Sequence, residues 1–110
     1  MCFMNNDMKT KRVKNYLCRI FIANVVDVNT FKEFEDILRD VFLWGSNKKF
    51  IFVNDKTRKQ IEPFIEEYIK RDANIYDSKF GTMKLACADG TVTDGELLFV
   101  DEDFYPKATF

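Results

Sequence analysis

The sequence predicts an α+β fold in which a small mixed sheet packs against two helices. Three observations support this class. Apolar runs rich in β-branched and aromatic residues alternate with two segments of helical periodicity, and the last third of the chain is rich in strand patterns. At 110 residues, of which 46% are hydrophobic and 32% charged, the chain is sufficient for one domain with one core.

The whole chain divides into two segments. Residues 1–14 are polar, contain three methionines and a basic cluster, and are expected to form a flexible basic arm. Residues 15–110 are expected to form the single α/β domain. Its first element is a buried strand over 16–26, where β-branched and aromatic side chains predominate.

The next segment carries the clearest helix signals. Thr30 and Glu33 have the spacing of a capping box, in which each side chain satisfies the other residue's backbone N–H. Gly45 supplies a left-handed stop, so a helix is predicted over 31–44. Its apolar stripe consists of Phe31, Phe34, Ile37, Leu38, Val41 and Phe42.

A strand over 49–53 leads into a second helical pattern, which Asn54 or Asp55 could cap. The apolar positions of this pattern are Ile61, Phe64, Ile65, Tyr68 and Ile69. Pro63 lies inside the pattern and lacks the N–H that would bond back to Lys59. Either the helix kinks at this proline, or a new helix begins with Glu62 as its cap.

Extended patterns follow Arg71. Alternating residues over 82–87 predict a half-buried strand, and 97–100 predicts another. Turn dipeptides at Asp89-Gly90 and Asp94-Gly95 separate them, so a surface hairpin with solvated acids is expected.

Catalysis is not expected, because the residues that usually carry it are missing from the sequence. The chain has no histidine, so a serine or cysteine nucleophile would lack its usual base. Glycine-rich phosphate loops are also absent. The three cysteines lack zinc-site spacing, and Cys18 and Cys87 are expected to be buried small hydrophobes. We therefore expect no enzyme activity, no cofactor and no metal.

Charge is unevenly distributed along the chain. The net charge is −1, which argues against a dedicated nucleic-acid binder. The head is nevertheless basic, and Lys11 and Arg12 are candidates for weak contact with nucleic acid. The tail is acidic, so head and tail could pair within one chain, pair between copies, or form two solvated faces. No apolar run is long enough to span a bilayer.

From Leu17 onward, the order of segments resembles the later half of a tailed-bacteriophage major capsid protein. The matching stretches are "VVDVNTFKEFEDILRDVFLWGSNKKFIFVNDKTRKQI" (25–61), "IYDSKFGTMKL" (75–85) and "ELLFVDEDFYPKATF" (96–110). The aromatic-glycine step Phe80-Gly81 and the acidic-aromatic segment from Asp101 to Tyr105 carry the resemblance most directly.

This resemblance implies a subdomain of the capsid fold and a structural role. Such a subunit or fragment would self-associate in a virion shell, or wait in the host cytoplasm before assembly. The alternative is a small non-catalytic binding module, of phage or bacterial origin, that docks on a host protein. Trp44 is either a core cover or an interface anchor. The candidate interface residues are Trp44, Phe80, Gly81, Asp101, Asp103, Phe104, Tyr105, Lys11 and Arg12.

Overall fold

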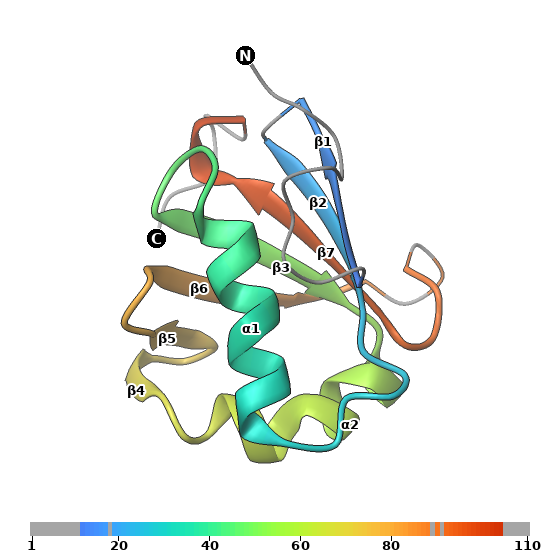
Figure 1. Ribbon diagram of the computed structural model, residues 1–110. Coiled ribbons are helices and arrows are strands. Elements are labelled where there is room, and N and C mark those ends of the chain that lie inside the picture. The colour runs from blue at the N-terminus through green and yellow to red at the C-terminus, as the bar shows by residue number, and fades with distance from the viewer. Residues whose placement is uncertain (1–11, 18, 89, 91, 105–110) are drawn as a thin grey trace.

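The computed structural model describes residues 12–17, 19–88, 90 and 92–104. It confirms the α+β class, with a mixed sheet of seven strands and two α-helices (Figure 1). The elements are, in order, β1 (Val13–Tyr16), β2 (Ile20–Asn24), α1 (Phe31–Phe42), β3 (Lys48–Val53), α2 (Asp55–Ile65), β4 (Ile69–Asp72), β5 (Ile75–Asp77), β6 (Thr82–Cys87), β7 (Glu96–Asp101) and the short 3-10 helix η1 (Glu102–Phe104).

The strand order across the sheet is β1-β2-β7-β3-β6-β5-β4. Strands β3 and β6 are parallel, and the other neighbouring strands are antiparallel. The connection from β2 to β3 through α1 and the connection from β3 to β6 through α2, β4 and β5 run in the same direction across the sheet. Right-handed connections of this kind place both helices on the same side of the sheet.

One hydrophobic core lies between the helices and that side of the sheet. Phe34 of α1 stacks on Phe64 of α2 with 5.6 Å between ring centroids, which joins the two helices. Ile51 of β3 and Phe99 of β7 lie at the centre of the sheet. Both belong to the same core and are fully buried. Figure 1 shows α1 across the front of the sheet, with α2 below it.

Helix α1 confirms the capping prediction. The Glu33 backbone N–H donates to the Thr30 hydroxyl at 3.2 Å, and the Thr30 N–H donates back to the Glu33 carboxylate at 3.1 Å. The regular helix ends two residues earlier than predicted, with Leu43 as C-cap. Gly45 has a φ of 70°, the left-handed conformation expected of it.

Helix α2 resolves the alternatives at Pro63. Asn54 is the cap, because its side chain accepts a 2.8 Å hydrogen bond from the Thr57 N–H. The helix is continuous through Pro63 and ends at Ile65, so no new helix begins there. The prediction that Ile69 lies on the helix is wrong. It belongs to edge strand β4 and is 73% exposed.

The N-terminal boundary also differs from the prediction. A single strand over 16–26 was expected, but the chain reverses at Leu17, whose φ is 57°, and forms two strands. The expected arm over 1–14 is too long, because Val13 is buried at 2% exposure in β1 and Lys14 belongs to the same strand. The rest of the arm, residues 1–11, lies outside the described residues.

Pairing at the C-terminal end corrects another expectation. Strands β6 and β7 do not form a hairpin, because β3 lies between them and pairs with both. A hairpin in this half of the chain is formed instead by β4 and β5, with its turn at Asn74, whose φ is 62°. Asp94-Gly95 is a turn as expected, and Gly95 has a φ of 82°. Asp89 of the other turn dipeptide lies outside the described residues.

Candidate functional site

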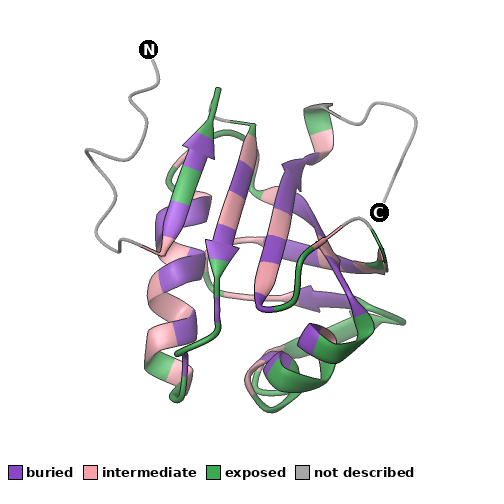
Figure 2. Cartoon of the chain, turned by 90° about the vertical axis from the view of Figure 1, so that its right-hand side faces the viewer, coloured by how far each residue is buried: buried purple, intermediate pink, exposed green. Residues whose placement is uncertain are grey.

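The sheet has a second face that neither α-helix covers. Buried and half-buried residues alternate along β2 and β7, as Figure 2 shows, so neighbouring residues point to opposite faces. The core side takes residues such as Phe21 and Phe99. Phe50 and Val100 are each only 5% exposed but are not part of that core, because they point to the other side.

The strand register aligns the apolar residues of this second face in two adjacent rows. One row runs through Ile22, Leu98, Phe52 and Ala86, which are cross-strand neighbours in β2, β7, β3 and β6. The other row contains Ile20, Val100 and Phe50 in β2, β7 and β3. We call these seven residues the helix-free face.

The helix-free face is apolar and built of large side chains. The Phe50 and Phe52 rings are stacked, with centroids 6.4 Å apart. Ile22, Leu98 and Phe52 are half-buried and so retain surface for a contact. Isolated exposed apolar residues are ordinary on protein surfaces, but a contiguous patch of this kind typically marks a site of association.

Charged side chains border this patch. The register places Lys14 beside Ile22 and Lys84 beside Phe50, at opposite ends of the two rows. Lys48 precedes Phe50 along β3 on the same side, and Glu96 precedes Leu98 along β7. An apolar centre with a charged rim is the usual anatomy of a protein–protein interface.

A shallow hollow of about 290 Å³ adjoins the patch at the β1-β2 edge. Its lining consists of Arg12, Lys14, Tyr16, Ile22, Asn24 and Glu96. The hollow is open and its lining is of mixed charge. It therefore differs from the usual small-molecule site, which is an enclosed apolar pocket with a few convergent polar groups. Within the described ranges, no cluster of three or more His, Cys, Asp or Glu side chains could hold a metal ion.

Asp101 was predicted to lie at an interface, and the structure corrects this prediction. Its side chain is 1% exposed on the core side, where the carboxylate forms an ion pair with the fully buried Lys49 ammonium. Asp101 also accepts a 2.9 Å hydrogen bond from the Ser46 N–H. The residue therefore stabilises the fold and is inaccessible to another chain.

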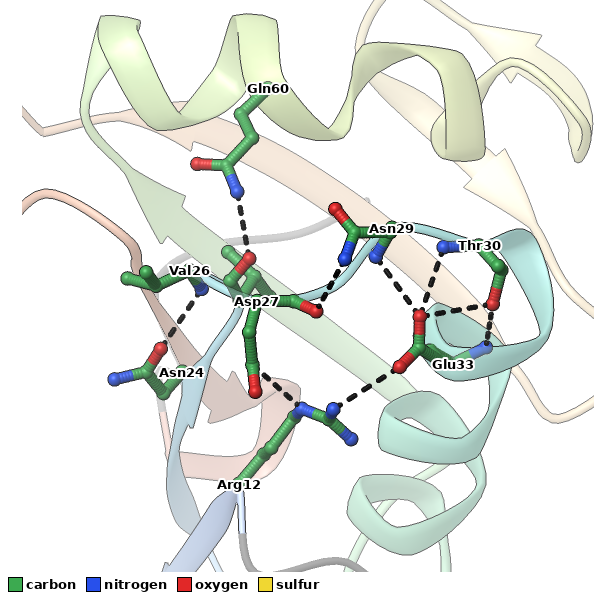
Figure 3. Close-up of polar contacts among 9 residues, drawn as sticks. Arg12, Asn24, Val26, Asp27, Asn29, Thr30, Glu33 and Gln60 are labelled. Carbon is green, nitrogen blue, oxygen red and sulfur yellow. Dashed lines mark hydrogen bonds and ion pairs between the residues drawn. The ribbon is translucent and has the colours of Figure 1, made fainter.

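Arg12, a predicted nucleic-acid contact, forms ion pairs within the chain (Figure 3). Its guanidinium contacts the Asp27 carboxylate at 3.1 Å and the Glu33 carboxylate at 3.2 Å. The hydrogen bond from Arg12 lowers the pKa of Asp27, and the Asn29 backbone N–H lowers the pKa of Glu33. These two carboxylates offset the charge that Arg12 would present to a phosphate.

The network in Figure 3 fixes the loop between β2 and α1. The Gln60 amide on α2 donates to the Val25 carbonyl at 2.7 Å, while Asn24 accepts from the Val26 N–H at 2.9 Å. The dashed contacts in Figure 3 all join groups of this one chain. These contacts thus join the residue that precedes β1, the loop and both helices, and their role is structural.

Two other predicted interface residues pack against the core. Trp44 and Phe80 are half-buried beside it, which favours the core-cover alternative for the tryptophan. Packing explains why residue 81 is a glycine. A Cβ at this position would lie 2.4 Å from the Asn47 carbonyl oxygen and 2.6 Å from the Phe42 ring. The aromatic-glycine step therefore allows a close approach of two chain segments.

The remaining candidates lie near the ends of the chain. Asp103 is exposed in η1, and Phe104 ends that helix. Tyr105 and Lys11 lie outside the described residues. Cys87 was expected to be buried but is exposed at the C-terminal end of β6. Cys18 lies outside the described residues.

Comparisons of this chain with protein-family models, with curated proteins and with solved structures found no match. The capsid resemblance therefore gains no support from them. Among the described residues, no helix combines the length and apolar character needed to cross a membrane.

Proposed function

We propose that this chain is a non-catalytic structural module that self-associates through the helix-free face. The observation that carries the proposal is the register of β2, β7, β3 and β6, which joins seven apolar side chains into one patch. In the fuller form of the proposal, suggested by the resemblance, the chain is a capsid-type subunit or fragment. It would then act in a virion, or in the host cytoplasm before assembly.

A second copy is the occupant that the geometry favours. Two twisted sheets pack face to face about 10 Å apart with their apolar side chains interdigitated. A two-fold axis between the sheets makes such an interface isologous, so one apolar face is sufficient for both partners. The rim carries both signs of charge, with Lys14, Lys48 and Lys84 against Glu96, so the charges that face a second copy are not all alike.

The area of the helix-free face determines how strong self-association is expected to be. The helix-free face occupies four strands. Strands about 4.8 Å apart and about 15 Å long give this face an area of roughly 290 Å² per copy. Two copies would bury about 580 Å² through these faces, well below the range of stable complexes, so the contact is expected to be weak. Association is therefore expected to be reversible and dependent on concentration.

Light scattering coupled to size exclusion, over a wide range of protein concentration, tests this proposal. Growth from monomer to dimer that persists in high salt is expected, because an apolar contact is not screened by ions. Association that disappears in high salt would instead indicate pairing of the basic head with the acidic tail. A monomer at every concentration and salt would favour the alternative function, a binding module that docks on a host protein.

A further inference from the structure

We propose that two copies pack their helix-free faces about a two-fold axis that runs across the strands, so that Lys48 of each copy meets Glu96 of the other. This inference rests on the proposed function, because it specifies how a second copy is oriented on the same face. It follows from where the strand register places the charges at the two ends of that face.

These two charges lie at opposite ends of the helix-free face. Lys48 precedes Phe50 by two residues in β3, so it lies one row beyond the row that contains Phe50. Glu96 precedes Leu98 by two residues in β7, so it lies one row beyond the row that contains Leu98. Because β3 and β7 are antiparallel, the two offsets lead in opposite directions. Lys48 and Glu96 are therefore equally far from the midline between the two rows.

Neither charge is neutralised within its own chain. Both residues are half-buried at the rim of the face. Among the residues that the structure describes, no ion pair involves Lys48 or Glu96, whereas the adjacent Lys49 is paired inside the core. Charges on the rim of an apolar patch are therefore available to pair with the opposite charge of a partner.

Two arrangements keep the strands of both copies aligned, and the charges distinguish them. In the first, the two-fold axis runs along the strands, between β7 and β3, and exchanges these two strands. Lys48 would then lie beside the partner's Lys48, and Glu96 beside the partner's Glu96. Like charges in contact repel each other, which disfavours this arrangement.

In the second arrangement, the two-fold axis runs across the strands, midway between the two rows. Each strand then lies over the same strand of the partner, in the opposite direction. Strands β3 and β7 are neighbours about 4.8 Å apart, so the partner's Glu96 comes beside Lys48, within reach of the long lysine side chain. The axis forms this contact twice, so opposite charges meet at both ends of the patch.

The apolar residues also match in the second arrangement, because the axis exchanges the two rows. Phe50 lies over the partner's Phe52, and both are large rings that stack within one chain. Lys84 lies over the partner's Ala86, whose small side chain leaves room for the lysine. Charge complementarity of this kind fixes orientation more than it adds affinity, so the apolar contact still provides most of the stability.

Cross-linking between cysteines tests the orientation directly. Lys48→Cys and Glu96→Cys are made separately in a chain that carries Cys2→Ser, Cys18→Ser and Cys87→Ser, and both are treated with a short bismaleimide. A mixture of the two variants should give a covalent dimer, and neither variant alone should do so. Covalent dimers from each variant alone would indicate the axis along the strands. Those dimers, or a mixture that gives no covalent dimer, would overturn the inference.

Charge reversal supplies a second test, read by sedimentation. Lys48→Glu and Glu96→Lys should each weaken the dimer about fivefold, because each places like charges together at both ends of the patch. The double substitution should recover the wild-type association constant. The control Lys70→Glu should have no effect, because Lys70 is the cross-strand neighbour of the core residue Tyr76 and so points to the helix side. Single variants that dimerise as well as the wild type, or a double variant no better than either, would overturn the inference.

The two tests separate the orientation from the proposed function. A wild-type dimer that shows neither cross-linking in the mixture nor a response to charge reversal would contradict the orientation and leave self-association standing. A chain that stays monomeric at every concentration and gives no covalent dimer would contradict both.

Discussion

The Lys49 ammonium contacts the Asp101 carboxylate inside the core, where neither side chain is more than 1% exposed. The same ammonium donates to the Trp44 carbonyl at 2.7 Å and lies 4.6 Å from the centroid of the Phe21 ring. Burial lowers the pKa of Lys49, which the Asp101 carboxylate opposes. This pair joins the end of α1, the start of β3 and the end of β7.

Removal of one member of this pair should be strongly destabilising. Asp101→Ala would leave the Lys49 ammonium buried without its counter-charge, at a cost of about 3–5 kcal/mol. The double variant Lys49→Met with Asp101→Leu should lose less than the single one, because it buries no charge. Urea unfolding of the three proteins measures this difference. A loss below about 1 kcal/mol for Asp101→Ala would mean that the pair contributes little.

Phe34 is expected to be among the most costly residues to truncate. It is fully buried and contacts the rings of Phe64 and Tyr68, so Phe34→Ala should cost about 3–5 kcal/mol in the free energy of unfolding. The exposed neighbour Lys32 supplies a control, since Lys32→Ala should change stability by no more than about 0.5 kcal/mol. Equal losses from the two substitutions would contradict the orientation of α1.

Gly81→Ala tests whether the aromatic-glycine step is needed for packing. The added methyl group would overlap the Asn47 carbonyl and the Phe42 ring, which should cost about 1–3 kcal/mol. Gly90→Ala is the comparison, because no atom lies within 4 Å of its Cβ position and only its φ of 84° opposes the change. Thermal unfolding should show the larger decrease for Gly81→Ala, and the reverse order would contradict the close approach.

Tyr68 should make stability fall in alkali. Burial, reinforced by the charge of Glu35, raises the pKa of its phenol above that of the unfolded chain. The folded state therefore keeps a proton that the unfolded state loses above about pH 10. The stabilisation is complete below that pH and is lost as the pH rises. Tyr68→Phe should flatten this decline in unfolding measurements from pH 8 to 11, and an unchanged slope would contradict the burial of the hydroxyl group.

The sequence predicted the helices well because their signals are local. Thr30 and Glu33 are three residues apart, and the stripe that contains Phe34 repeats within one segment. The order of the strands could not be read in this way. Strand β3 pairs with β7 across about fifty residues, and no local pattern specifies which strand lies between β6 and β7.

The candidate site was missed for a related reason. Residues 50–53 form a continuous apolar run, in which the core residue Ile51 and the outward residues Phe50 and Phe52 look alike. Only the register with Leu98 and Val100 shows that the outward residues form one patch. Asp101 shows the opposite error, because it was predicted to lie at an interface and is in fact buried. An acidic residue within an acidic tail is expected to be solvated, and only the structure shows that it pairs with Lys49.

Self-association through the helix-free face is the central claim, and sedimentation velocity of charge-substituted chains tests it most directly. Ile22→Glu and Leu98→Glu each place a carboxylate at a half-buried position in the patch. The control is Leu43→Glu, at the end of α1, where the leucine is 56% exposed. The wild-type chain and Leu43→Glu should form a dimer as concentration rises, while both patch variants, shown to be folded by circular dichroism, remain monomeric. Dimers of equal stability in all four proteins would contradict the claim.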